Sequence, residues 1–231
     1  MWVYRSDDDN VRILRGASGV AAVLLAALCS ITALTGVSQQ RFEWVDAPTR
    51  YAAALVRDGG WLRAIIAVDD LFIAAYTIAT IYLAATLAQR RFRVEHALVI
   101  MGGVGAGLLD LSENHQLLGL LRFAEQTVAI EAQTILARSD ASQLKWLVGH
   151  LTFVLVGLSL PRGGELPRRM LAWSLVWFQL PIGALVWTVS QPELREGLVW
   201  ARYASFLVGF VVISLLAPRI AGDAGETGAP A

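Results

Sequence analysis

Residues 63–88 read RAIIAVDDLFIAAYTIATIYLAATLA, and this stretch decides the fold class. It is apolar over more than the roughly 20 residues that an α-helix needs to cross a bilayer. Asp69 and Asp70 interrupt it, although an aspartate at the centre of such a helix costs about 2.5–3.5 kcal/mol on insertion scales. Carboxylates persist at this depth when they face a bundle interior or a wet cavity, so the pair indicates a buried polar site.

The remaining apolar runs of the chain complete the predicted topology. Only 16% of the 231 residues are charged and 56% are hydrophobic, whereas soluble domains carry about 25% charged residues. We expect membrane spans at 16–37, 63–88, 96–121, 144–160, 170–190 and 198–217. The sequence therefore predicts an all-α, polytopic integral membrane protein, a six-transmembrane-helix bundle whose single membrane domain covers 16–220.

Charge and turn signals predict how the spans are oriented and connected. Arginines gather before the first span, after the second and fourth, and after the sixth, so the positive-inside rule predicts a multi-pass cell-membrane protein with both termini cytoplasmic. Residues 1–15 are then a cytoplasmic N-terminal segment, and 221–231 form a disordered cytoplasmic tail. In the outer loops, 38–62 and 122–143, Asp46-Ala47-Pro48 and helical spacing predict short interfacial helices.

Polar residues of the second and third spans fall at one depth. Asp69 lies about two turns from the outer start of the second span, and Asp110 and Asn114 lie about two to three turns from the outer end of the third. At 1.5 Å per residue, both sets are about 10–16 Å below the outer boundary. Two adjacent antiparallel helices would therefore bring these side chains together.

Helical spacing also predicts which faces meet. Gly103, Gly107 and Asp110 follow one stripe of the third span, where the glycines let another helix approach closely. Asp69 and Tyr76 share a face of the second span. The two faces together are expected to form a sheltered acidic site.

The residue types suggest acid/base chemistry at this site. Burial would keep one carboxylate protonated as a general acid, while a partner beside a cation stays ionised as a base. The candidate catalytic residues are Asp69, Tyr76, Asp110, Glu113 and Asn114. Lys145, Arg202 and Asp70, at the same predicted depth, are candidates for binding substrate.

A metal or haem is a further interpretation of the same side chains. Hard oxygen donors and an imidazole suit a divalent cation, and the candidate ligands are Asp69, Asp110, Glu113 and His115. No named metal motif has this spacing. His115 and His150 also lie at one depth, as the ligands of a b-type haem would. The identity of any cofactor stays open.

These features favour one class of function and leave two others open. The favoured prediction is a membrane-embedded enzyme acting on a lipid or isoprenoid by acid/base or metal-assisted chemistry. The alternatives are a proton- or cation-coupled small-molecule transporter and a non-catalytic membrane subunit whose polar cluster is structural. The expected partners are membrane lipids and a lipid or small-molecule substrate, and a homo-oligomer is compatible with the pattern. A net charge of +0 without a basic patch argues against nucleic acid.

Overall fold

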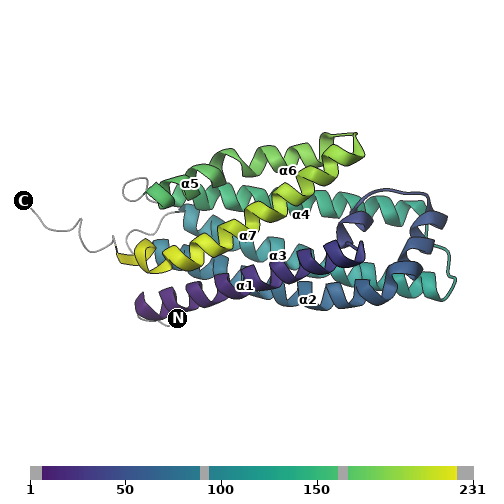
Figure 1. Ribbon diagram of the computed structural model, residues 1–231, viewed down its shortest axis with the longest axis horizontal. Helices are drawn as coiled ribbons and strands as arrows, with labels where there is room; N and C mark the ends of the chain where they lie inside the picture. Colours follow the sequence, from purple (N-terminus) through teal and green to yellow (C-terminus); the bar gives the residue numbers. More distant parts are fainter. Residues whose placement is uncertain (1–6, 89–93, 161–165, 223–231) are drawn as a thin grey trace, which may run out of the picture.

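Long helices form almost all of the chain that the computed structural model describes, which is residues 7–88, 94–160 and 166–222 (Figure 1). The elements in order are α1 (Asp7–Thr35), the 3₁₀ helix η1 (Gln39–Glu43), α2 (Pro48–Ala88), α3 (Val94–Glu125), α4 (Ala132–Ser159), α5 (Leu166–Trp177), α6 (Gln179–Thr188) and α7 (Pro192–Gly222). These residues include no strand. Six helical segments, with α5 and α6 together counted as one, are long and apolar enough to span a membrane. The predicted all-α six-helix bundle is confirmed.

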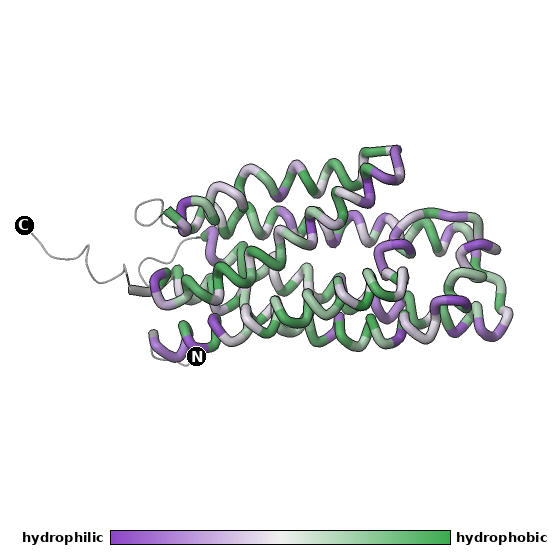
Figure 2. The backbone as a smooth tube through the Cα atoms, viewed as in Figure 1, coloured by the Kyte–Doolittle hydropathy of each residue, from purple (hydrophilic) through white to green (hydrophobic). Residues whose placement is uncertain are grey.

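The helices pack mainly against their neighbours in the chain. α1 lies against both α2 and α7, α3 lies between α2 and α4, and α5 and α6 cover α4. The start of α1 and the end of α7 lie at one end of the bundle, and η1 lies toward the other, which we call the η1 end (Figure 1). Hydrophobic residues dominate the middle of the helices, whereas hydrophilic residues gather at the ends (Figure 2).

Glycines on α3 allow α2 to approach closely. A Cβ atom on Gly103 would lie 2.5 Å from Thr80 Cγ2, and one on Gly107 would lie 2.5 Å from Thr77 Oγ1. Real Cβ atoms do not come this near, so a larger residue at either position would push the helices apart. The structure thus confirms that this stripe faces a neighbouring helix, as small residues at an intramembrane interface do.

The helices at the η1 end are longer than predicted. The patterns at 49–57 and 132–138 are helical, but they continue α2 and α4, so the prediction of separate interfacial helices is wrong there. Each added residue of a started helix gains a backbone hydrogen bond, and the extensions also bury apolar side chains together. This cluster includes Phe42, Tyr51, Leu55, Leu121 and Ile135. The only short helix found in these loops is η1, capped by Ser38, whose hydroxyl accepts a hydrogen bond from Gln40 N at 3.1 Å.

The fifth span is broken where a single helix was expected at 170–190. α5 ends at Trp177 and α6 begins at Gln179. Pro181 has no N–H to donate to the carbonyl of Trp177, which explains an interruption at this point. The expected N-terminal segment is partly helical, because residues 7–15 are the first turns of α1. Outside the described residues lie 1–6, the loop arginines at 90–93 and 162, and the tail from 223.

Candidate functional site

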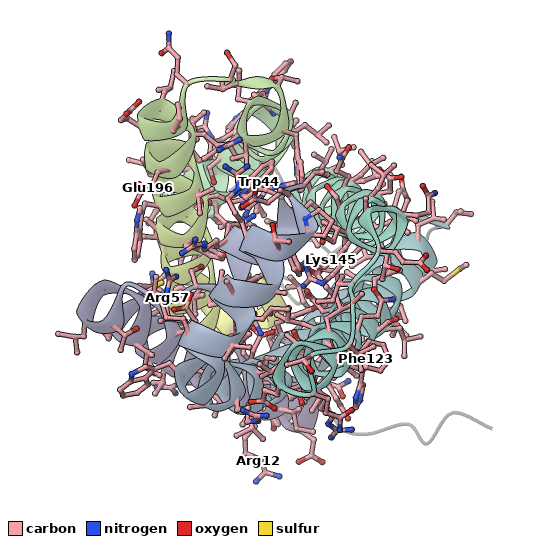
Figure 3. The ribbon with its side chains drawn as sticks, turned by 90° about the vertical axis from the view of Figure 1, so that its right-hand side faces the viewer. Arg12, Trp44, Arg57, Phe123, Lys145 and Glu196 are labelled. Atoms are coloured by element: carbon pink, nitrogen blue, oxygen red, sulfur yellow. The ribbon has the colours of Figure 1, made fainter. Side chains whose placement is uncertain are left out.

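Lys145 is the centre of a buried polar cluster near the η1 end. Its Nζ lies 2.5 Å from Glu113 Oε2, 3.0 Å from Asp110 Oδ1 and 3.2 Å from Glu43 Oε1. Seen along the bundle from the η1 end, Lys145 lies in the interior, among the helices (Figure 3). One ammonium group therefore links η1, α3 and α4, and it offsets part of the charge of three carboxylates.

Glu113 is engaged on both of its oxygens. Arg138 Nη2 donates to Oε1 at 3.0 Å and Ser142 Oγ donates to the same oxygen at 2.7 Å, while Lys145 lies beside Oε2. Arg138 also donates to the carbonyl of Phe42, which joins α4 to η1. All of these side chains are buried. Glu113 thus has the environment of an ion pair that holds helices together.

Glu43 is the carboxylate that the loop between α1 and α2 contributes. Gln40 Nε2 and Trp146 Nε1 donate to its Oε2, the latter at 2.9 Å. Gln40 is held in turn by Arg202, whose Nη2 donates to Gln40 Oε1 at 2.5 Å and whose guanidinium lies 3.4 Å from the centre of the Trp146 ring. Burial raises the pKa of Glu43, and the nearby charge of Lys145 opposes that shift.

Asn114 brings the adjacent aspartates of α2 to α3. Its Nδ2 donates to Asp69 Oδ2 at 2.9 Å and to Asp70 Oδ1 at 2.8 Å, and its Oδ1 accepts from Gln39 Nε2 at 3.1 Å. Within the described residues neither aspartate has an ion-pair partner. The predicted meeting of the second and third spans at this depth therefore occurs through a neutral amide.

Tyr76 and Asp110 form a second link between α2 and α3. The Tyr76 hydroxyl donates to Asp110 Oδ2 at 2.6 Å, while Lys145 lies beside Oδ1. This short hydrogen bond gives a path for a proton between the phenol and the carboxylate. The link is separate from the pairs that Asn114 makes.

Two adjoining cavities reach these groups. A cavity of about 630 Å³ lies between α1, α2 and α7 beneath η1, and a chamber of about 90 Å³ lies deeper between α2, α3, α4 and α7. Both are lined by Gln39, Asp69, Phe72 and Tyr203. The polar side chains around the inner chamber include Glu43, Asp69, Tyr76, Asp110, Lys145 and His150. Its aromatic walls are formed by Phe72, Trp146, Phe153, Tyr203, Phe206 and Phe210.

His150 faces the inner chamber without satisfying its ring nitrogens. It is only 2% exposed, and neither Nδ1 nor Nε2 has a hydrogen-bond partner among the described residues. Gly183 of α6 makes room for the ring, because a Cβ atom there would lie 2.3 Å from His150 Cδ2. Nε2 is 2.7 Å from the same Cβ position, so this nitrogen lies against α6.

The structure divides the candidate residues into those that face a cavity and those that do not. Of the catalytic candidates, Asp69, Tyr76 and Asp110 line the inner chamber, Asn114 positions Asp69, and Glu113 lines neither cavity. Of the substrate-binding candidates, Lys145 lines the chamber. Asp70 and Arg202 line neither cavity. Asp70 accepts a hydrogen bond from Asn114, and Arg202 donates to Gln40, which lines the larger cavity.

The proposed metal ligands are not brought together. His115 is exposed on α3, whereas Glu113 and Asn114 beside it are buried, because successive residues of a helix point about 100° apart. Lys145 occupies the position among the acids that a metal ion would take. Within the described ranges no group of three His, Cys, Asp or Glu side chains could hold a metal ion. Exposure of His115 also separates it from the buried His150 as a haem ligand.

Several residues of the cluster were not anticipated as site residues. Arg138 and Ser142 could have been found, since their spacing of four and three extends the face of Lys145 outward along one helix. Glu43 had no such signal, because it lies in a short 3₁₀ helix between spans. Only the tertiary structure brings it to the lysine.

Comparisons with protein-family models, curated proteins and solved structures found no match to the chain. The site is therefore interpreted from its own chemistry. In the part of the chain that is described, Arg41, Arg195 and Glu196 line the larger cavity, and five carboxylates and three cations form the polar cluster around Lys145. The carboxylates are Glu43, Asp69, Asp70, Asp110 and Glu113, and the cations are Arg138, Lys145 and Arg202.

Proposed function

We propose that this protein is a membrane-embedded enzyme that acts on a lipid or isoprenoid by acid/base chemistry. The observation that carries the proposal is the adjoining pair of cavities, in which Asp69, Tyr76, Asp110 and Lys145 face an aromatic chamber inside a bundle of apolar helices. Titratable groups converging in a concave apolar site are the usual signature of a reactive centre. A substrate with a long apolar part matches such walls.

Asp69 is the carboxylate best suited to exchange a proton with the substrate. It lines both cavities, and its hydrogen bond from Asn114 engages Oδ2 alone. Oδ1 therefore remains available to a reacting group, while Asn114 and the neighbouring Asp70 orient the side chain. In this scheme Asp69 is the general acid or base, and Asn114 is a positioning residue.

Tyr76 and Asp110 supply the second proton-carrying group. The phenol donates to Asp110 at 2.6 Å, and Lys145 lies 3.0 Å from the other oxygen of that carboxylate. The ammonium places a positive charge beside Asp110, so a proton that Tyr76 takes from the substrate can be matched by the passage of the phenol proton to Asp110. With Asp69 and the Tyr76–Asp110 pair in one chamber, a proton can be added at one atom of the substrate and removed at another.

Acid/base chemistry fits the chamber better than metal-assisted chemistry. The ammonium of Lys145 already lies among Glu43, Asp110 and Glu113. A divalent cation in the same place would be repelled by it at close range. The proposal therefore assigns no role to a metal ion.

The proposal is tested by replacing Asp69 with asparagine. We expect cells that produce the wild-type chain to differ in lipid composition from cells that lack it, and Asp69→Asn to abolish that difference while the protein stays abundant and folded. Asp140→Asn, on an exposed position of α4, is the matched control and should behave as wild type. Unchanged lipids with wild-type protein, or full activity with Asp69→Asn, would contradict an acid/base role.

A second candidate function is a structural one, and Glu113 favours it. Its ion pairs with Arg138 and Lys145 and its hydrogen bond from Ser142 leave no oxygen facing either cavity. If the whole cluster served only to hold the helices together, Asp69→Asn would lower thermal stability, as we expect Glu113→Gln to do. The two candidates are distinguished by whether the Asp69 variant loses activity or loses stability.

A further inference from the structure

The cavities have a charge that selects for a positive ligand. Among the described residues that line the two cavities, four carboxylates face three cations: Glu43, Asp69, Asp110 and Glu196 against Arg41, Lys145 and Arg195. An excess of negative charge in a concave site attracts a positive ligand. Within the described residues, the carboxylates without an ion pair are on α2, where Asp69 and Asp70 share only the neutral amide of Asn114. Lys145 makes its ion pairs with Glu43, Asp110 and Glu113 instead.

Aromatic rings surround the same space. Phe72 lies between Tyr76 and Phe210, with ring centres 5.2 and 5.9 Å away, and Trp146 stacks on Phe206 at 6.1 Å. The faces of such rings attract cations, most strongly where water is excluded. Carboxylates within an aromatic wall are the features by which proteins recognise ammonium groups.

The larger cavity provides room for an apolar chain. α7 packs on α1 near the end opposite η1, where Ser214 Oγ donates to Arg15 O at 3.0 Å, and the two helices then diverge (Figure 1). The space between them is lined by Leu28 of α1 and Trp200 of α7, and it reaches Asp69. A chain lying in this groove would lead to the acidic chamber.

Charged groups of both signs lie at the mouth of the groove. Arg41 lies 3.8 Å from Asp58, which also accepts two hydrogen bonds from Arg57. Arg195 lies over the ring of Trp44 at 4.4 Å, and Glu196 also lines the cavity. Asp69, the carboxylate without an ion pair in the described structure, lies deeper, so we expect a positive head group to bind there.

We propose that the joined cavities bind a single-chain amphiphile with an ammonium head, the head beside Asp69 and the chain in the groove between α1 and α7. This inference rests on the proposed site and names its substrate class.

A pair of photoactivatable probes tests this binding. The full chain is placed in nanodiscs of zwitterionic lipid and labelled with a diazirine-bearing dodecylamine or with the alcohol of the same chain. We expect the amine to label α1 and α7 saturably, unlabelled dodecylamine to compete, and the alcohol to label weakly. Asp69→Asn should lower the affinity for the amine about tenfold, as the loss of a charge-assisted contact does. Asp140→Asn should leave the affinity unchanged.

A second variant keeps the test valid if Asp69→Asn does not fold. Ala33→Trp would fill the groove at an exposed residue of its lining while leaving the acids intact, so it should also reduce labelling. Equal labelling by amine and alcohol, or labelling that neither variant reduces, would overturn the inference. Asp69-dependent capture of the amine without any change in cellular lipids would contradict the proposed enzyme but support this binding site.

Discussion

Among single residues, Lys145 determines how the carboxylates divide their roles. Its Nζ lies within 3.2 Å of oxygens from Glu43, Asp110 and Glu113, but the described structure gives it no ion pair with Asp69. The paired acids are therefore held in place by a cation, whereas the described contacts leave Asp69 Oδ1 available to a group that enters the cavity. Similar side chains at one depth thus acquire different chemistry from their partners.

Glu113→Gln is expected to destabilise the fold. The change would leave Arg138 and Lys145 with one fewer negative partner in a buried setting, and breaking a buried ion pair costs about 3–5 kcal/mol. Thermal unfolding of the purified protein in detergent should shift to clearly lower temperature. Asp140→Asn, on the exposed side of α4, should unfold as wild type does. An unchanged unfolding temperature for Glu113→Gln would show that its ion pairs contribute little.

Glu43 is expected to make stability depend on pH. Its pKa in the folded protein is raised above the ordinary value of 4.5, chiefly by burial. The folded state therefore holds the proton more tightly, so the contribution of Glu43 to stability is greatest below pH 4.5 and falls as the pH rises through the folded pKa. Glu43→Gln cannot titrate and should lack this decline.

The measurement is the unfolding free energy of wild type and of Glu43→Gln across the acidic and neutral range. As the pH rises above 4.5, the unfolding free energy of wild type should fall relative to that of Glu43→Gln. Glu131→Gln, at an exposed residue before α4, should give a curve parallel to that of wild type. Parallel curves for Glu43→Gln as well would rule out the raised pKa.

Among the elements, η1 and the glycine contacts do most to place the site. η1 folds Glu43 and Gln40 inward, where Glu43 meets Lys145 of α4 and Gln40 meets Arg202 of α7. Farther along α4, a Cβ atom on Gly157 would lie 2.8 Å from Ala172 O and 2.9 Å from a side-chain carbon of α5. Close backbone packing therefore holds α5 against α4.

Gly157→Ala is expected to destabilise this packing. A backbone oxygen cannot move aside as the end of a side chain can, so the added methyl group would cost about 1–3 kcal/mol. Gly149→Ala, in the same helix but with nothing within 4 Å of the new atom, should keep or slightly raise thermal stability. Equal unfolding temperatures for the two variants would show that α5 adjusts freely.

For the molecule as a whole, we predict a bundle that places both chain ends in the cytoplasm. The start of α1 and the end of α7 lie at the same end of the bundle, so the two must face the same side of any membrane that all six segments cross (Figure 1). Arg12 and Arg15 on α1, Arg168 and Arg169 on α5 and Arg219 on α7 favour the cytoplasm for that side.

Reporter fusions measure this orientation in the cell membrane. A fluorescent protein that matures only in the cytoplasm should be bright when attached to either end, and a phosphatase that needs export should be inactive there. The phosphatase should become active when inserted after Val45, an exposed residue of the η1 end. The reverse pattern would place the acidic chamber toward the cytoplasm.

By itself, the sequence determined the class of fold and the level at which polar residues of the second and third spans meet. Apolar runs long enough to cross a bilayer predicted six spans, and a rise of 1.5 Å per residue placed Asp69 level with Asp110 and Asn114. These inferences succeed because they depend on short stretches of chain and on regular helix geometry. The same regularity correctly predicted that a neighbouring helix comes close at Gly103 and Gly107, and the structure identifies it as α2.

Only the tertiary structure decided which acids are paired and which face a cavity. Glu43 meets Lys145 across 102 residues of sequence, and Gln40 meets Arg202 across 162. Contacts of this kind depend on how several helices and η1 pack in three dimensions, and no local periodicity records them. For the same reason the sequence predicted His115 as a metal ligand and Arg202 as a substrate-binding residue, although neither lines a cavity. Depth alone does not say which way a side chain points.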